Sequence, residues 1–294
     1  MKRLAFVQRQ DLGHWVGDGF PVRSVFSYHE HSAALSPFLL LDYAGPAEFS
    51  PSERRRGVAE HPHRGFETVT IVYDGEVEHR DSSGGGGIIG PGDVQWMTAG
   101  AGIVHEEFHS LAFSRRGGRF EVVQLWVNLP AQDKMALPRY QPILGSDIPS
   151  VEISAGTVRP IAGEFAGRRG PAHTFTPINL WDVRLDADTR AEFIVPAGHT
   201  VAVFVRSGSV VLDGTRVEEA AAAVLGREGD SLALTAEQHA ALLILTGEPI
   251  EEPVVGYGPF VMNSEREIEQ AIVDYRSGKM GRLRAEERVK TKLS

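Results

Sequence analysis

Residues 67–81 read ETVTIVYDGEVEHRD, two short runs rich in Val, Thr and Ile on either side of the pair Asp74-Gly75. This pattern predicts two strands joined by a tight hairpin turn, because glycine readily takes the backbone conformation that such a turn requires. The next stretch, SSGGGGIIGPGD at 82–93, lacks the Gly-Lys-Ser/Thr of a phosphate-binding loop, so we interpret it as a flexible hairpin connection. The chain has 32 glycines, which punctuate further short apolar runs in the same way. We therefore expect an all-β fold.

The chain also shows signs of internal duplication. A second strand–turn–strand pattern, TVAVFVRSGSVVLDG, occurs at 200–214, and GDVQWMTAG at 92–100 is echoed by GDSLALTAE at 229–237, 137 residues further on. Because 137 residues is nearly half of a 294-residue chain, each half is expected to form one β-barrel of similar plan. The segment at 128–150, NLPAQDKMALPRYQPILGSDIPS, is rich in proline and polar residues and marks the expected boundary.

One helix is predicted near the C-terminus, in the sequence SEREIEQAIVDYRSGKMG that begins at Ser264. Ser264 is suited to cap the helix, with Glu267 three residues later, and Gly278 is suited to end it. Apolar residues recur between them at helical spacing: Ile268, Ile272 and Tyr275. We expect this helix to pack against a barrel as a closing element.

Composition narrows the possible partners and the chemistry. A net charge of −9 argues against a nucleic-acid-binding face, since the densest basic run is only Arg54-Arg55-Arg56. No apolar run is long enough to span a bilayer, and the N-terminal apolar stretch is too short for a signal peptide, so we expect a cytoplasmic protein that does not bind membranes. Because there are no cysteines, a metal would have to bind through histidine and carboxylate.

Two short motifs offer such ligands. In EHPHRGFETV, His61 and His63 are two residues apart, and in GAGIVHEEFHS the same spacing separates His105 from Glu107. Residues i and i+2 of a strand face the same side, so each pair can point into a barrel interior, and adjacent antiparallel strands would bring the pairs together. Three imidazoles and one carboxylate suit a divalent first-row metal. Glu67 shares the strand parity of His61 and His63 and is an alternative fourth ligand.

The remaining histidines show no such pairing. We expect His109, which follows Phe108 at the end of a strand, to lie behind the ligands or on the surface, and His79 to line the pocket or to have a structural role. In the second half, His199 and His239 lack a companion ligand, which predicts a barrel that has lost its metal. The others lie among loop residues and are interpreted as ordinary polar positions: His14, His29 and His31.

The segments HPHRGFETVT and GDVQWMTAGAGIVHEE are strongly similar to those of the pirin family, whose members carry two cupin domains. Further similarity lies in SPFLLLDYAGP (36–46), GPFVMNSEREI (258–268) and DYRSGKMGRL (274–283), so the resemblance extends over nearly the whole chain. It implies two cupin barrels of the double-stranded β-helix (jelly-roll) type with a C-terminal helix. The expected domains are 1–135, which binds the metal, and 150–294, which lacks the metal motif.

The resemblance also implies a ligand set and a metal. In pirins an iron-type metal is held by residues that correspond here to His61, His63, His105 and Glu107, which favours Glu107 over Glu67. Fe(II) is the expected working metal, and Ni, Cu or Zn are alternative occupants, because these ions bind such sites more tightly than iron or about as tightly. The family more often has a small residue where this chain has Glu106, which strand parity directs away from the metal.

Two activities follow from the resemblance. Several pirin-like proteins resemble quercetin 2,3-dioxygenases, in which a metal-bound flavonol reacts with O₂ and its heterocycle opens with loss of carbon monoxide; Glu107 would then act as the base that accepts the flavonol hydroxyl proton. Others resemble regulators that act on transcription or on metabolic enzymes through a protein partner, without turnover. A sugar-binding or isomerase cupin is a third reading, which the pirin-like segments disfavour. Phe66, Trp96 and Met97 are candidate walls for a flat ligand, although barrel cores also use such residues.

Overall fold

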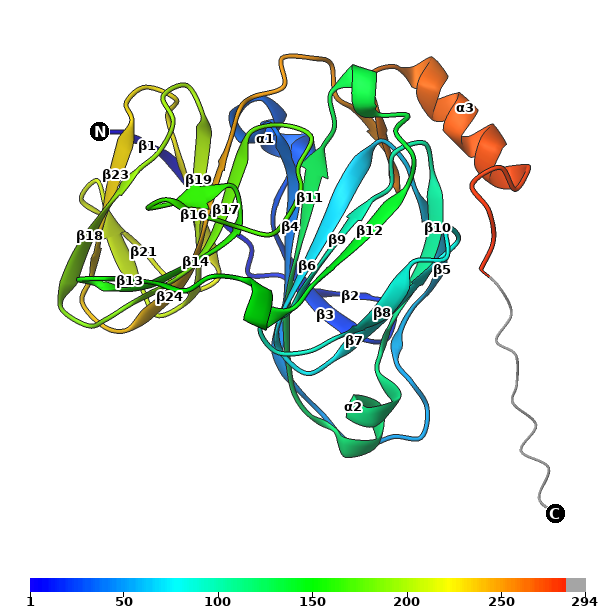
Figure 1. Cartoon of the computed structure of the whole chain (residues 1–294), viewed down its shortest axis with the longest axis horizontal. Coiled ribbons are helices and arrows are strands. Elements are labelled where there is room, and N and C mark those ends of the chain that lie inside the picture. The colour runs from blue at the N-terminus through cyan, green and yellow to red at the C-terminus, as the bar shows by residue number, and fades with distance from the viewer. Residues whose placement is uncertain (284–294) are drawn as a thin grey trace.

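The computed structural model describes residues 1–283, which form two β-barrels side by side (Figure 1). Each barrel combines a seven-stranded and a four-stranded antiparallel sheet. The first barrel contains β2 (His14–Val16), β3 (Phe20–Ser27), β4 (Phe38–Phe49), β5 (Gly57–His63), β6 (Phe66–Asp74), β7 (Val77–Asp81), β8 (Gly86–Ile89), β9 (Val94–Thr98), β10 (Ile103–His109), β11 (Gly118–Asn128) and β12 (Arg139–Ile143). The second contains β1 (Leu4–Arg9), β13 (Val151–Ile153), β14 (Gly156–Ala162), β17 (Ile178–Leu185), β18 (Thr189–Ile194), β19 (Thr200–Ser207), β20 (Val210–Leu212), β21 (Thr215–Val217), β22 (Ala221–Leu225), β23 (Ser231–Ala236) and β24 (Ala240–Gly247).

The two barrels have the same strand order, which confirms the predicted pair of cupin domains. The order β12-β9-β6-β11-β4-β3-β2 in the first is matched by β1-β22-β19-β24-β17-β14-β13 in the second, and β5-β10-β7-β8 is matched by β18-β23-β20-β21. This order aligns β9, from the segment 92–100, with β22. The echo at 229–237 instead forms β23, the counterpart of β10. The echo between 92–100 and 229–237 was therefore misaligned by one strand, because Gly-Asp turns precede several strands of this fold.

The strand pairing crosses the expected domain limits of 1–135 and 150–294 at both ends. β1 leaves the first half and pairs with β22 of the second barrel, where it takes the place that β12 has in the first. β12, which lies beyond residue 135, pairs with β9 of the first barrel. β1 thus belongs to the other barrel than its place in the sequence suggests, and β12 adds a segment between the two expected domains to the first barrel. Residues 284–294, the end of the expected second domain, lie outside the described residues.

The predicted tight turns exist, but they do not make hairpins. Gly75 and Gly208 both have positive φ, 86° and 76°, at the ends of β6 and β19. β6 pairs with β9 and β11, whereas β7 pairs with β8 and β10 in the other sheet. The turn therefore carries the chain from one sheet to the other, as barrel closure requires. Part of the glycine-rich stretch forms β8, which pairs with β7 as a true hairpin.

The C-terminal helix forms as predicted. It is α3 (Glu265–Arg276), and the Ser264 hydroxyl oxygen accepts a hydrogen bond from the backbone N–H of Glu267 at 3.4 Å. Its buried face contacts the first barrel, where Arg64 donates to Asp274 at 3.0 Å. Short elements outside the barrels are α1 (Tyr28–Leu35), α2 (Leu111–Arg116), β15 (Glu164–Phe165), β16 (Arg168–Arg169), β25 (Val255–Tyr257) and β26 (Phe260–Met262). Within residues 1–283, no helix has the length and apolarity needed to span a membrane.

A buried ion pair joins the two barrels. Arg206 of β19 donates to Glu121 of β11 at 2.7 Å, and Tyr43 of β4 donates to the same carboxylate oxygen at 2.8 Å. The guanidinium of Arg206 also lies 4.0 Å from the ring centre of Tyr73. Apolar side chains of both barrels pack together in the same region and form one core cluster. The contact between barrels is thus a continuous core with a charged pair enclosed in it.

Replacement of Arg206 by Met should lower the free energy of unfolding by about 2 kcal/mol, because the Glu121 carboxylate, only 2% exposed, would keep only the half-exposed Arg119 as a cationic partner. Arg115→Met is the matched control, since the Arg115–Glu53 pair is exposed and contributes at most about 1 kcal/mol. Urea unfolding of the two variants measures the difference. Equal destabilisation would show that the buried pair does not hold the barrels together.

Candidate metal centre

Three imidazoles meet where β5 and β10 pair inside the first barrel. The antiparallel register places His105 opposite His61 and Ile103 opposite His63. The ring centres of His61 and His105 are 4.3 Å apart, and that of His63 is 4.9 Å from His61 and 4.8 Å from His105. One ligand atom from each ring lies within 4.8 Å of the others. The two motifs identified in the sequence therefore converge as expected of adjacent strands.

The hydrogen bonds of His61 and His63 leave their Nε2 atoms free. Nδ1 of His61 contacts the carbonyl oxygen of Ala59 at 2.8 Å, and Nδ1 of His63 contacts that of Pro259 at 3.4 Å. A carbonyl oxygen can only accept, so each Nδ1 carries the proton and each Nε2 keeps its lone pair. Burial lowers the pKa of His63 well below the usual value for an imidazole, and the neighbouring His61 lowers it further. Neutral rings with free lone pairs are the form that binds metals.

Two hydrogen bonds in series also place the proton of His105 on Nδ1. Asp81 accepts from Nε2 of His79 at 3.0 Å, so Nδ1 of His79 is an acceptor. It lies 3.3 Å from Nδ1 of His105, which must then be the donor. This leaves Nε2 of His105 with a lone pair, and that atom is buried without a hydrogen-bond partner among residues 1–283. Burial also lowers the pKa of His105 well below its usual value.

An unpartnered buried nitrogen costs roughly 1–3 kcal/mol, which coordination of a metal would offset. The donor set of His61, His63 and His105 therefore fits a divalent first-row metal. His61 is only half-buried, so this side of the cluster faces the opening of the barrel.

Glu107 lies beside His105 rather than among all three rings. Its carboxylate shares a group with His79 and His105 in which the ligand atoms are within 4.8 Å of one another. One carboxylate oxygen accepts from Gln95 at 2.6 Å and the other from Gln124 at 3.0 Å. The roles of His61, His63, His105 and Glu107 as metal ligands stay a prediction.

Aromatic donors orient both glutamine amides. The Tyr140 hydroxyl donates to Oε1 of Gln95 at 3.3 Å, and the indole N–H of Trp126 donates to Oε1 of Gln124 at 3.3 Å. Each amide oxygen is thereby occupied, so each amide NH₂ points to Glu107. Both oxygens of Glu107 therefore accept hydrogen bonds from oriented amides, which is the acceptor role that a ligand or a base requires.

The alternative ligand Glu67 lies apart from this group. Glu67 is 1% exposed and accepts from the Thr98 hydroxyl at 2.8 Å. Burial raises its pKa to about 7. The carboxyl group is therefore a buried acid of the barrel core, and strand parity with His61 and His63 was misleading because Glu67 belongs to β6 in the other sheet.

Two neighbours of the motif have other partners. Glu106 faces away, as expected, and accepts from Arg80 at 2.8 Å. His109 is not exposed: its exposed fraction is 2%, and its Nε2 donates to the carbonyl oxygen of Gly19 at 2.9 Å. Burial among four phenylalanines lowers its pKa to about 4. The sequence could not show this, because those rings come from four different segments.

The aromatic wall beside the histidines differs from the one expected. Phe66 contacts His63 with ring centres 5.1 Å apart and stacks on Trp126 at 4.3 Å. Trp126, which sequence reasoning missed, is only partly buried and also contacts His63. Trp96 and Met97 are fully buried among core side chains instead. No sequence motif marks Trp126, Tyr140, Gln95 or Gln124, since their roles depend on strand pairing.

The other histidines lie away from this cluster. His79 is fully buried and its ring stacks on Tyr140, with ring centres 4.8 Å apart. His199 is buried in the second barrel beside Thr246, and His239 is exposed near Asp186. His14 is exposed at the surface, and α1 carries His29 and His31.

Comparison with known proteins decides the family. The model of the pirin family matches residues 19–127, and that of the pirin C-terminal cupin domain matches residues 180–281. This chain belongs to the pirin family. A Pseudomonas aeruginosa relative, provisionally named quercetin 2,3-dioxygenase PA2418, is 55% identical over 95% of this chain and 98% of its own.

Two further relatives differ in whether their names state an activity. The crystal structure of a quercetin 2,3-dioxygenase from Acinetobacter baumannii matches this pirin with a TM-score of 0.93 and 53% identity, over 96% of this chain and 99% of that one. Human pirin is 39% identical over 85% of each chain, and its name carries no activity. The resemblance to pirins drawn from the sequence is confirmed.

Replacement of Glu67 by Gln should change how stability depends on pH. The carboxyl group has a higher pKa in the folded protein than in the unfolded chain, so its contribution is complete below about pH 4.5 and is lost as the pH rises through about 7. Between these values the wild type should lose up to about 3 kcal/mol that the variant keeps. Urea midpoints at pH 5 and pH 8 measure this, with Glu48→Gln at an exposed position as the control. Parallel curves for wild type and Glu67→Gln would contradict the assignment.

Proposed function

We propose that this pirin is a metal-dependent dioxygenase that opens the heterocycle of flavonols such as quercetin with O₂, releasing carbon monoxide. The observation that carries the proposal is the cluster of three imidazoles, His61, His63 and His105, beside the Glu107 carboxylate, whose oxygens accept from two amides. The names of two close relatives point to the same reaction.

The proposed ligands are His61, His63, His105 and Glu107, and Fe(II) is the proposed metal, with Ni, Cu or Zn as alternative occupants. A bound divalent metal would polarise a chelating hydroxyketone and bring O₂ next to it. Three neutral imidazoles and one carboxylate leave the centre with net positive charge and open positions. His79 and Asp81 hold His105 in the tautomer that this role requires.

Glu107 is the proposed base. Its oxygens are held by amide donors from Gln95 and Gln124, and a carboxylate in this position can accept the flavonol hydroxyl proton as the substrate binds. These amides would also keep the carboxylate oriented while it changes partner. The stacked pair of Phe66 and Trp126 beside His63 offers an aromatic surface for a flat substrate.

A second candidate function is a metal-binding regulator that acts through a protein partner without turnover. It is favoured by the relationship to human pirin and to plant pirin-like proteins, whose names carry no activity. Both functions use the same ligands, so only turnover distinguishes them.

The deciding experiment is oxygen consumption with quercetin by iron-, nickel- and copper-loaded protein, alongside elemental analysis of the bound metal. The double variant His61→Ala/His63→Ala should lose the metal and at least about 99% of turnover, because only one imidazole ligand remains. His14→Ala/His239→Ala is the matched control, since both of its histidines are exposed. It should keep both metal and activity.

Wild-type protein that holds a full equivalent of each metal and consumes no oxygen with quercetin would reject the dioxygenase and favour the regulator. A double variant that retains its metal would reject the ligand assignment, whatever the activity.

A further inference from the structure

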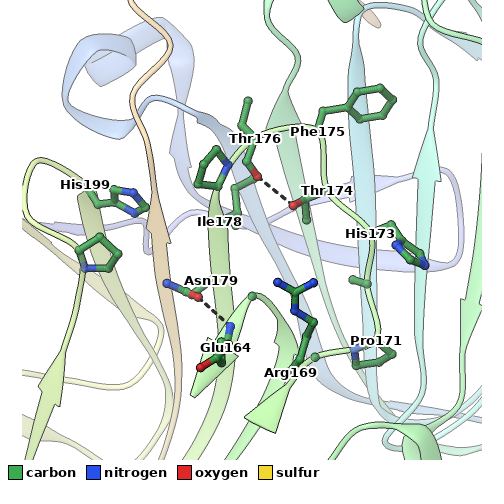
Figure 2. A pocket seen from close by; sticks show the side chains of 15 residues that line it. Glu164, Arg169, Pro171, His173, Thr174, Phe175, Thr176, Ile178, Asn179 and His199 are labelled. Carbon is green, nitrogen blue, oxygen red and sulfur yellow. Dashed lines mark hydrogen bonds between the residues drawn. The ribbon is translucent and has the colours of Figure 1, made fainter. Parts of the chain in front are cut away.

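A second cavity lies on the second barrel, outside the histidine cluster. It has a volume of about 620 Å³ and lies between the β15–β16 hairpin, the loop at 170–178 and the turn before β19. Small-molecule sites in proteins commonly occupy roughly 300–1,000 Å³, so it is large enough for an organic ligand. Figure 2 shows Arg169 and His199 on opposite sides, with Ile178 and Asn179 between them.

Arg169 brings an uncompensated positive charge to this cavity. Its strand neighbour across β15–β16 is Glu164, yet the two side chains form no ion pair, and no other described residue within 1–283 makes a hydrogen bond or ion pair with the Arg169 guanidinium. A guanidinium offers five N–H donors in a planar fork that matches a carboxylate. The natural partner for this side of the cavity is therefore an anionic oxygen pair.

The opposite side presents a neutral N–H donor, set by a chain of hydrogen bonds. Oδ1 of Asn179 accepts from the backbone N–H of Glu164 at 3.0 Å, so its amide NH₂ donates to the Thr246 hydroxyl at 2.9 Å. The hydroxyl of Thr246, which is fully buried, has one remaining neighbour among the described residues, Nδ1 of His199 at 3.4 Å. Donation to that nitrogen satisfies the hydroxyl and leaves the proton of His199 on Nε2.

Apolar surface separates the two polar ends. Ile178 is buried between Arg169 and His199, and Phe175, 40% exposed, also lines the cavity. Burial lowers the pKa of His199, which favours the neutral form of its ring. The cavity thus matches a molecule with a carboxylate at one end, a flat apolar middle and a neutral oxygen at the other end.

We propose that this cavity binds a hydroxyaryl carboxylate, with the carboxylate on the Arg169 guanidinium and the hydroxyl oxygen accepting from Nε2–H of His199. Glu164 also lines the cavity, at an exposed position, and its negative charge opposes the ligand. The site is separate from the proposed oxygenase centre and does not depend on a metal.

Titration calorimetry with 4-hydroxycinnamate and with cinnamate, which lacks the hydroxyl, tests the proposal. Neither probe carries the hydroxyketone of a flavonol, and metal-free protein is used because a carboxylate can also bind a metal. Arg169→Gln should weaken binding of both probes about tenfold or more, because a charge-assisted pair is lost. Arg168→Gln is the matched control, since Arg168 lies next to Arg169 in β16, is also exposed and does not line the cavity. Glu164→Gln should strengthen binding.

The contact with His199 has its own readout. His199→Phe keeps an aromatic ring but removes the N–H, so it should abolish the preference for 4-hydroxycinnamate over cinnamate, a ratio that general loosening of the barrel would not change. The proposal is overturned if wild-type protein takes up neither probe at millimolar concentration, or if Arg169→Gln and Arg168→Gln bind alike. An unchanged ratio in His199→Phe would overturn the assigned role of His199.

Discussion

The register of β5 against β10 is the constraint on which the centre of the first barrel depends. It sets His105 opposite His61, and a shift between His105 and Glu107 then places Glu107 opposite Val58, so that β5 has one more residue than β10 in this interval. Such a bulge re-aims side chains within a continuous ladder. Two effects follow together: the three imidazoles converge, and the carboxylate turns toward the amides of β9 and β11 instead of joining His61 and His63.

The second barrel shows that this frame does not itself demand a metal. Gly75 and Gly208 occupy equivalent turns, which makes Leu212 the counterpart of His79 and its partner Leu234 the counterpart of Glu107. Two residues earlier, Leu232 takes the place of His105 and faces Phe193 where His61 would be. All four are buried in one apolar cluster. The same strand register therefore holds polar side chains in the first barrel and apolar side chains in the second.

The features of the fold that depend on neighbouring residues could be predicted from the sequence. Turn residues, strand parity and the Ser264 cap are properties of neighbouring residues, and the two-barrel fold, the convergence of the two motifs and α3 follow from them. The exchange of β1 and β12 between barrels could not be read in this way, because both strands satisfy the same local rules in either sheet. The surroundings of Glu67 and His109 could not be predicted for the same reason, since parity fixes a face and not the sheet or segment that covers it.

The residues around the centre determine which atoms of His105 and Glu107 can accept a hydrogen bond or bind a metal. Asp81, acting through His79, obliges His105 to keep a lone pair on Nε2, while Tyr140 and Trp126, acting through two glutamines, oblige Glu107 to remain an acceptor at both oxygens. The buried Nε2 lone pair of His105 therefore has no donor among residues 1–283, which is unfavourable in a buried site. A cation at this position would offset that cost. This hydrogen-bond pattern favours a cation in the first barrel, whereas the equivalent positions of the second barrel hold apolar side chains.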